Sequence, residues 1–197
     1  MKKILSCLEL RFNFYDLIAL ISLIFSISFV LIFQLKEIQE NTILENLQTI
    51  ILFLGFLFCF KAKNHKPLFI FGALIFFLMV AREMSYGRVI FAQMPDNPHE
   101  FYSWKHFKYG FLAHYIIGAY IGISVLYGII KKIWINVVEI FKTIKFPIWT
   151  FSGCFICLIL QLLSEKTLHN TIIEETSELV LYSLLLSLLL YYLKKTK

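Results

Sequence analysis

Six long runs of apolar residues, separated by short polar or basic segments, restrict this chain to a bundle of membrane-spanning helices. The runs cover residues 17–35, 43–60, 67–91, 110–130, 147–164 and 171–193. A helix rises about 1.5 Å per residue, so about 20 residues cross a hydrocarbon core of about 30 Å. Charged residues make up 16% of the chain, against about 25% in soluble domains. The pattern predicts an all-α, polytopic membrane protein with six transmembrane helices in a single domain over residues 1–197.

Two local features refine this prediction. Residues 131–145 alternate lysines with large apolar side chains such as Trp134 and Phe141. A basic amphipathic helix typically lies in the membrane–water interface, so we expect a short interfacial helix between the fourth and fifth spans. Asp16 directly precedes the first apolar run, where an aspartate often caps a helix, and we expect it to act as the N-cap of the first span.

The distribution of basic residues predicts the orientation. Cytoplasmic loops of membrane proteins carry an excess of Lys and Arg. With the N-terminus inside, most of the 19 basic residues are cytoplasmic, namely Lys2, Lys3, Arg11, Lys61, Lys63, Lys66, Lys131, Lys132, Lys142, Lys145, Lys194, Lys195 and Lys197. We therefore expect a multi-pass protein of the cell inner (cytoplasmic) membrane with both termini cytoplasmic. Its net charge of +6 then reflects topology, so the expected partner is the lipid bilayer and not nucleic acid, with the oligomeric state left open.

Polar residues from several spans fall at one depth, in the outer half of the predicted bundle. They are Glu45 and Gln48 in the second span, Arg82, Glu83, Ser85 and Arg88 in the third, His114 in the fourth, Gln161 in the fifth, and Glu174, Glu175 and Glu178 in the sixth. Ionisable side chains near hydrocarbon are costly, and they usually face a protein interior or a water-filled cavity. We therefore expect these side chains to form one site.

The fourth span carries a second pattern. Gly110, His114, Gly118 and Gly122 recur every four residues and so share one helix face. Small residues on one face let a neighbouring membrane helix approach closely. The pattern predicts a packed seam between helices, with His114 set into it.

The residue types at the predicted site suggest several roles. Glu83, Glu174, Glu178 and His114 are the candidate catalytic acid–base residues. The candidate ligand-binding residues are Arg82, Arg88, Glu45, Gln48, Glu175 and Ser85, with the two arginines suited to a phosphate. Glu83, His114 and Glu178 are also the candidate ligands of a divalent metal ion, the one cofactor that these residues suggest. Five glutamates face two arginines, so a protonated carboxyl, a bound cation or a cationic ligand group would balance the charge. Alternatively, the arginine–glutamate pairs only join helices.

Residues 82–91, with the sequence Arg-Glu-Met-Ser-Tyr-Gly-Arg-Val-Ile-Phe, resemble the signature of a family of small six-helix bacterial inner-membrane proteins of unassigned function. The family pattern is similar to Glu-Glu-Ile-Ser-Trp-Gly-Gln-Arg-Ile-Phe. It is accompanied by an early Glu-x-x-Gln and a late Glu-Glu-x-x-Glu, as in 45–48 and 174–178 here. Tyr86 stands where the pattern has tryptophan, and Arg88 where it has glutamine. The resemblance implies the six-helix fold but no particular activity.

Three classes of function fit these observations. The first is a membrane enzyme, such as a hydrolase or transferase, or a binding protein that takes a lipid or lipid-linked ligand from the outer side, with the aromatic loop 92–109 at the entrance. The second is an ion- or proton-coupled transporter built from two three-helix repeats. The inner halves of the spans lack ionisable residues, which disfavours a conduit. The third is a non-catalytic membrane subunit or assembly factor.

Overall fold

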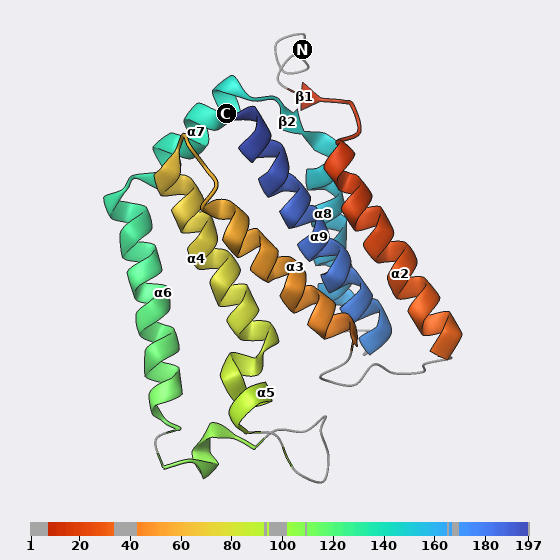
Figure 1. Cartoon of the computed structure of the whole chain (residues 1–197), viewed down its shortest axis with the longest axis vertical. Helices are drawn as coiled ribbons and strands as arrows, with labels where there is room; N and C mark the ends of the chain where they lie inside the picture. Colours follow the sequence, from red (N-terminus) through yellow and green to blue (C-terminus); the bar gives the residue numbers. More distant parts are fainter. Residues whose placement is uncertain are drawn as a thin grey trace.

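The computed structural model of the chain describes residues 8–33, 43–92, 94, 102–108, 110–164, 166 and 170–196, and the backbone alone at residues 89 and 90. The described part is helical except for a short parallel pairing of β1 (Leu8–Glu9) with β2 (Phe146–Pro147). Figure 1 shows the long helices lying side by side between two ends. β1, the turn with Lys61, Lys63 and Lys66, and the end of α9 form what we call the basic end. The opposite end, where Glu83 and Glu174 lie, is the acidic end.

The helices occupy the predicted apolar runs. They are α2 (Leu17–Phe33) after the 3₁₀ turn η1 (Phe14–Asp16), α3 (Ile43–Cys59), α4 (Lys66–Glu83), the turn η2 (Ser85–Gly87), α5 (Arg88–Phe91), the turn η3 (Trp104–His106), α6 (Leu112–Ile130), α7 (Ile133–Thr143), α8 (Ile148–Leu163) and α9 (Thr171–Lys195). The short helix expected between the fourth and fifth spans is α7. Residues 34 and 35, at the end of the first predicted span, lie outside the described part.

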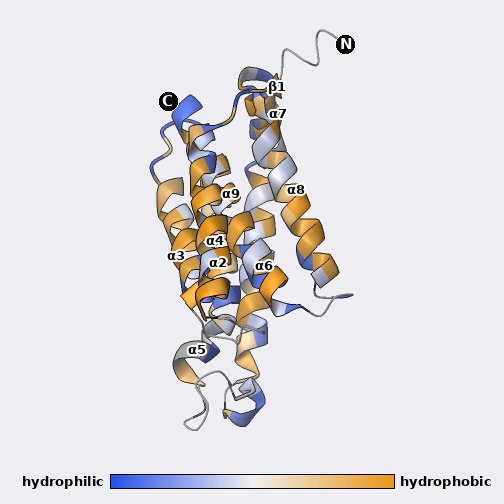
Figure 2. Cartoon of the chain, turned by 90° about the vertical axis from the view of Figure 1, so that its right-hand side faces the viewer, coloured by the Kyte–Doolittle hydropathy of each residue, from blue (hydrophilic) through white to orange (hydrophobic). Residues whose placement is uncertain are grey.

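Three of these helices are long and apolar enough to cross a membrane, over Phe14–Phe33, Leu112–Ile130 and Thr171–Lys195. α3 and α8 are apolar but shorter, with 17 and 16 residues. α4 has 18 residues and includes Lys66, Arg82 and Glu83 at its two ends. Figure 2 shows that apolar residues fill the middle of the helices, while polar residues gather toward the ends.

α9 is the central helix of the bundle. α2, α3 and α8 all pack against it, α4 packs on α3, and α6 and α7 contact α4 at the edge (Figure 1). Asn170 starts α9 as its N-cap, with Oδ1 accepting hydrogen bonds from the backbone N–H groups of Ile172 and Ile173 at 3.1 Å. Such a cap satisfies amides that the first helical turn leaves without partners. Since α9 is buried on several sides, its polar side chains must find partners inside the bundle.

The third predicted span is interrupted, contrary to the expectation of one helix over 67–91. α4 ends at Glu83, and Ser85, Tyr86 and Gly87 follow with φ values of 46°, 53° and 91°. Glycine adopts this left-handed region freely, but for other residues it costs about 1–2 kcal/mol each. A right-handed helix cannot continue through such residues, so α5 leaves the axis of α4 at the level of Arg82 and Glu83 (Figure 1).

Asp16 does not cap the first span as expected. Asn13 takes that role for η1, where its Oδ1 accepts a hydrogen bond from the amide of Tyr15 at 3.2 Å. Asp16 is instead buried, and its carboxylate accepts hydrogen bonds from Thr150 Oγ1 in α8 at 2.9 Å and from Ser187 Oγ in α9 at 2.5 Å. Asp16 lies inside a helical segment, because the η1 turn begins before it. Its side chain therefore faces the neighbouring helices α8 and α9.

The glycine pattern of α6 does not form the predicted seam within the described part of the chain. A Cβ atom added at Gly118 or Gly122 would meet nothing within 4 Å, and His114 is exposed. α6 instead faces α4 through Tyr120, whose hydroxyl donates a hydrogen bond to the Leu74 carbonyl at 2.9 Å. The prediction was wrong because a spacing of four selects a face of a helix but not the neighbour that this face meets.

Candidate functional site

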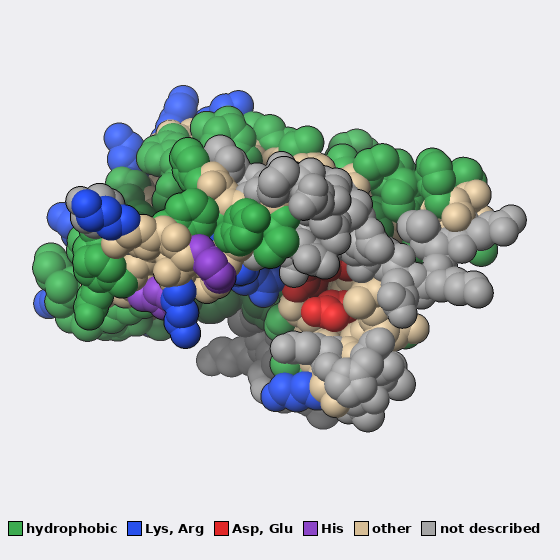
Figure 3. Space-filling model, turned by 90° about the horizontal axis from the view of Figure 1, so that it is seen from below, with side chains coloured by type: hydrophobic (Ala, Val, Ile, Leu, Met, Phe, Trp, Pro, Cys, Tyr) green, Lys and Arg blue, Asp and Glu red, His purple; other side chains and the backbone are tan. Residues whose placement is uncertain are grey.

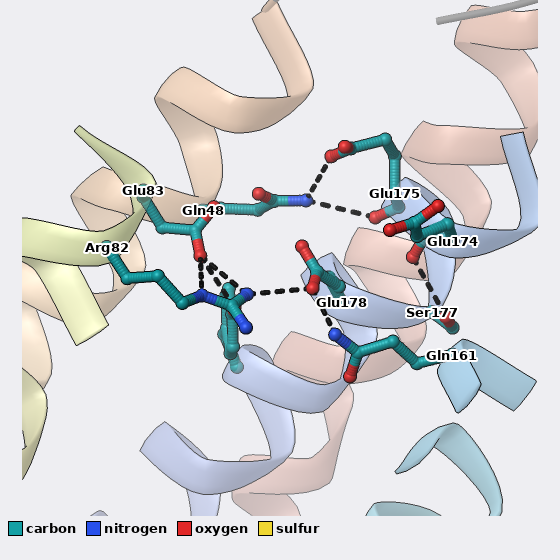
Figure 4. A network of polar contacts seen from close by, with 9 residues as sticks. Gln48, Arg82, Glu83, Gln161, Glu174, Glu175, Ser177 and Glu178 are labelled. Atoms are coloured by element: carbon teal, nitrogen blue, oxygen red, sulfur yellow. Dashed lines mark hydrogen bonds and ion pairs between the residues drawn. The ribbon is translucent and has the colours of Figure 1, made fainter. Parts of the chain in front are cut away.

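An ion-paired group of side chains joins the last turn of α4 to α9 at the acidic end (Figure 4). Arg82 Nη2 donates hydrogen bonds to Glu178 Oε1 at 2.7 Å and to Glu83 Oε1 at 2.8 Å, and Arg82 Nε also donates to Glu83 at 3.0 Å. The Tyr182 hydroxyl donates to Glu83 Oε1 at 2.8 Å and accepts a hydrogen bond from Arg82. The guanidinium therefore bridges two carboxylates that come from different helices.

Glu178 also connects to a third helix. The side-chain amide of Gln161, in α8, donates a hydrogen bond to Glu178 Oε1, the same oxygen that accepts from Arg82. The side chains of Glu83 and Glu178 are 6% and 9% exposed, whereas that of Arg82 is 47% exposed. Hydrogen bonds to ionised groups are stronger than neutral ones, so this arrangement orders α4, α8 and α9 relative to one another.

A second pair joins α3 to α9 beside the first group. Gln48 is fully buried, and its Nε2 donates hydrogen bonds to Glu175 Oε2 at 2.9 Å and to the Glu175 backbone carbonyl at 3.0 Å. Glu45 lies one turn before Gln48 in α3, and Glu174 precedes Glu175 in α9. We call Gln48, Arg82, Glu83, Gln161, Glu174, Glu175, Glu178 and Tyr182 together the acidic network.

Spacing along α9 explains part of the acidic network. Glu175, Glu178 and Tyr182 follow one another at three and four residues, which places them on one face of a helix. The sequence analysis selected the two glutamates but missed Tyr182. Its position, one turn after Glu178 on the same face, was the signal that could have identified it. The sequence placed Gln161 at the same level but gave it no role in the site, because its bond to Glu178 depends on how α8 packs against α9.

Carboxyl groups outnumber cationic groups in the acidic network. Its four carboxylates, from Glu83, Glu174, Glu175 and Glu178, share one guanidinium, that of Arg82. Figure 3 shows acidic side chains at the surface of the acidic end. The network is therefore a polar, acid-rich region at one end of an apolar bundle.

Arg88 and His114 lie at a different place from the acidic network. Arg88 Nε donates a hydrogen bond to the backbone carbonyl of Ser85 at 3.4 Å, so Ser85 helps to hold Arg88 in place. Arg88, Lys105 and His114 line one cavity of about 440 Å³ between the η2 turn, η3 and α6. Among the described residues, no group of three His, Cys, Asp or Glu side chains could hold a metal ion, so the set Glu83, His114 and Glu178 is not assembled.

A larger cavity of about 630 Å³ adjoins this basic one, between α4 and α6. Tyr86, Trp104 and Ile117 line both cavities. The other side chains around the larger cavity are almost all apolar: Phe77, Leu78, Ala81, Phe107, Lys108, Gly110, Leu112, Ala113, Ile116 and Tyr120. We call the two together the α4–α6 groove, with Arg88, Lys105 and His114 as its basic rim.

No protein-family model, curated protein or solved structure matches this chain. A function therefore has to follow from the geometry of its own residues. The acidic network offers carboxylate and amide oxygens, which suit a positively charged group. The α4–α6 groove offers an apolar wall beside cationic side chains, which suits an amphipathic molecule with a negative head group.

Proposed function

We propose that the chain is a six-span protein of the cytoplasmic membrane, with both termini cytoplasmic, that binds a lipid or lipid-linked ligand on its outer side. Three helices have the length and composition of membrane spans, and the shorter apolar helices lie alongside them (Figure 1). Lysines of the α3–α4 turn and of the end of α9 share the basic end, as the positive-inside rule requires of a cytoplasmic face. The acidic end is then the outer one.

The α4–α6 groove is the observation that carries this proposal. Its larger cavity has a volume within the range of about 300–1,000 Å³ that is typical of small-molecule sites. Its walls are formed by side chains such as Leu78 and Ile116, which match a hydrocarbon chain in polarity. A lipid chain that binds in this cavity would bury few polar groups of the protein, so binding would carry little desolvation cost.

The basic rim specifies the head group. Arg88, Lys105 and His114 lie at the end of the groove nearest η3, where a phosphate would meet two permanent positive charges. A guanidinium matches the oxygens of a phosphate in geometry as well as in charge. Trp104 and Tyr86 stand between the apolar cavity and the rim, as aromatic side chains commonly do at a membrane–water boundary. An anionic lipid therefore fits better than a neutral one.

Binding is better supported than catalysis. None of the described residues that line the α4–α6 groove is acidic, and Glu83 and Glu178 are engaged with Arg82 in the acidic network. A hydrolase or transferase would need a general acid or base within hydrogen-bonding reach of its substrate. His114 is the one candidate for that role at the rim.

Native mass spectrometry of the full chain, released from nanodiscs of mixed lipids, tests the proposal. Ile117→Trp should fill the groove and remove the retained lipid, whereas Ile123→Trp, exposed on another face of α6, should retain it. The double change Arg88→Gln and Lys105→Gln should reduce the preference for phosphatidylglycerol over phosphatidylcholine at least tenfold. Equal retention by the Ile117→Trp and Ile123→Trp proteins would contradict lipid binding in the groove.

Asp16 favours a second candidate, an ion- or proton-coupled transporter. This carboxylate is buried among α2, α8 and α9 near the basic end, where the sequence analysis expected no ionisable group inside the bundle. The hydroxyls of Ser22 and Ser183 form a hydrogen bond of 2.7 Å one turn of α9 from Ser187. Buried polar contacts therefore lie along both halves of α9. Proton flux into proteoliposomes that Asp16→Asn abolishes would support transport, and equal flux with and without the protein would exclude it.

A further inference from the structure

The side-chain oxygen of Gln48 lacks a hydrogen bond in a place where one is expected. Gln48 is 0% exposed, and no described residue donates a hydrogen bond to its Oε1. Buried polar atoms in proteins are nearly always paired, and an unpaired one costs about 1–3 kcal/mol. Figure 4 shows the Gln48 amide inside the acidic network, between Glu83 and Glu175.

The orientation of this amide follows from its neighbour. Gln48 Nε2 donates to both the carboxylate and the backbone carbonyl of Glu175. Both of these atoms are acceptors, so exchanging the nitrogen and oxygen of Gln48 would place an acceptor against two acceptors. Oε1 is therefore fixed as a buried hydrogen-bond acceptor that has no donor among the described residues.

The acidic network around Gln48 is rich in hydrogen-bond acceptors. Arg82, the guanidinium of the acidic network, already bonds to Glu83, Glu178 and Tyr182. Arg82 and Gln161 both donate hydrogen bonds to Oε1 of the Glu178 carboxylate. A group that brings both positive charge and several hydrogen-bond donors would complement these oxygens.

We propose that the acidic network binds a primary ammonium group, held by Gln48 Oε1 and by the carboxylates of Glu175 and Glu178. An ammonium has three N–H donors, which matches these three acceptors. Metal–oxygen bonds of about 2.0–2.6 Å require a tighter cluster of ligands than N–H···O bonds of about 2.9 Å. Among the described residues no three His, Cys, Asp or Glu side chains are grouped closely enough to hold a metal ion, which favours an ammonium over a metal here.

Helix packing alone does not require this arrangement. Leu44 and Leu179, both fully buried, already pack α3 against α9 beside Gln48. The ion pairs of Arg82 join α4 to α9 without Gln48 or Glu175. If Gln48 and Glu175 served only to pack the helices, their burial would cost free energy of folding, since both side chains lose hydration in the bundle.

An ammonium group could come from a soluble amine or from the head group of an aminophospholipid, and one experiment separates these sources. The full chain in phosphatidylglycerol nanodiscs is titrated with ethylammonium chloride, with tetramethylammonium chloride as a cation of equal charge without N–H donors. We expect ethylammonium to raise Tm and tetramethylammonium to have no effect. If phosphatidylethanolamine in the nanodisc raises Tm in place of ethylammonium, the ligand is a lipid head group. Equal shifts by both cations, a larger shift by calcium chloride, or no shift by either ammonium source would overturn the proposal.

Two variants test the residues. Glu175→Gln keeps the size of the side chain and removes one charge, and Gln48→Met removes the unpaired oxygen. Each should weaken the response to the effective ammonium source at least tenfold, while Glu139→Gln, exposed on α7, should leave it unchanged. If Glu175→Gln folds and keeps the full response, the network is structural. Ile117→Trp in the α4–α6 groove should not affect this response, so lipid binding and ammonium binding can fail separately.

Discussion

Arg82 Nη2 donates a hydrogen bond of 2.7 Å to Glu178 Oε1, and this ion pair connects the last turn of α4 to α9. Glu178 is buried and the arginine is half exposed, so removal of the arginine leaves a buried carboxylate without its counterion. Removing one partner of a fully buried pair costs about 3–5 kcal/mol. Because water reaches Arg82, we expect about 2–3 kcal/mol for Arg82→Met.

Reversible unfolding in mixed detergent micelles, followed by tryptophan fluorescence, measures this loss of free energy. Lys105→Met, an exposed change of the same type, is the control and should cost less than about 0.5 kcal/mol. The double change Arg82→Met and Glu178→Met should recover part of the loss, because neither charge is then left without a partner. If Arg82→Met alone is as stable as the unchanged protein, the ion pair does not hold α4 to α9.

Hydroxyl groups around Asp16 should stabilise the bundle near the basic end. Ser187 Oγ and Thr150 Oγ1 both donate to its buried carboxylate. A hydrogen bond to a charged group contributes about 1.5–3 kcal/mol, so we expect Ser187→Ala and Thr150→Val each to lower the free energy of unfolding by about 1.5 kcal/mol. Thr143→Val is the matched control, because Thr143 is exposed and bonds to its own helix. Equal stability of the Thr150→Val and Thr143→Val proteins would contradict the buried position of Asp16.

Two helical glycines should respond to substitution in opposite directions. A Cβ at Gly55 would lie 2.5 Å from the buried ring of Phe76, where α3 packs on α4. Gly55→Val should therefore force the helices apart and destabilise the protein by about 1–3 kcal/mol. At Gly118 there is open space, so Gly118→Ala should gain about 0.5–1 kcal/mol from helix propensity. Heat denaturation in detergent compares the two, and a loss of stability at Gly118 would show that α6 packs against another chain.

The proposed topology predicts which residues a membrane-impermeant maleimide can reach. In a cysteine-free background, Lys105→Cys at the acidic end should react in intact cells. Lys66→Cys, exposed at the first residue of α4 at the basic end, should react only after the membrane is permeabilised. Reaction of both residues in intact cells would contradict a bundle with its two ends on opposite sides of the membrane.

The positions of the helices could be predicted from the sequence because burial in an apolar environment depends on local composition. The apolar runs coincide with α2, α3, α4, α6, α8 and α9 to within a few residues at most of their ends. The exception is the end of the third run, where Ser85 and Tyr86 adopt left-handed backbone angles. Neither residue type favours that conformation, so Gly87 was the one sign of the break within these three residues.

For the candidate site, the sequence by itself determined depth along each helix axis, because a helix advances a constant 1.5 Å per residue. Arg82, Gln48 and Glu178 were expected at one level on this ground, and the structure brings them into one network. Rotation about each axis and the choice of neighbouring helix arise only when side chains from different helices pack together. The tertiary structure alone therefore separated Arg88 and His114 from the acidic network, added Tyr182 to it, and buried Asp16 among hydroxyl groups at the other end.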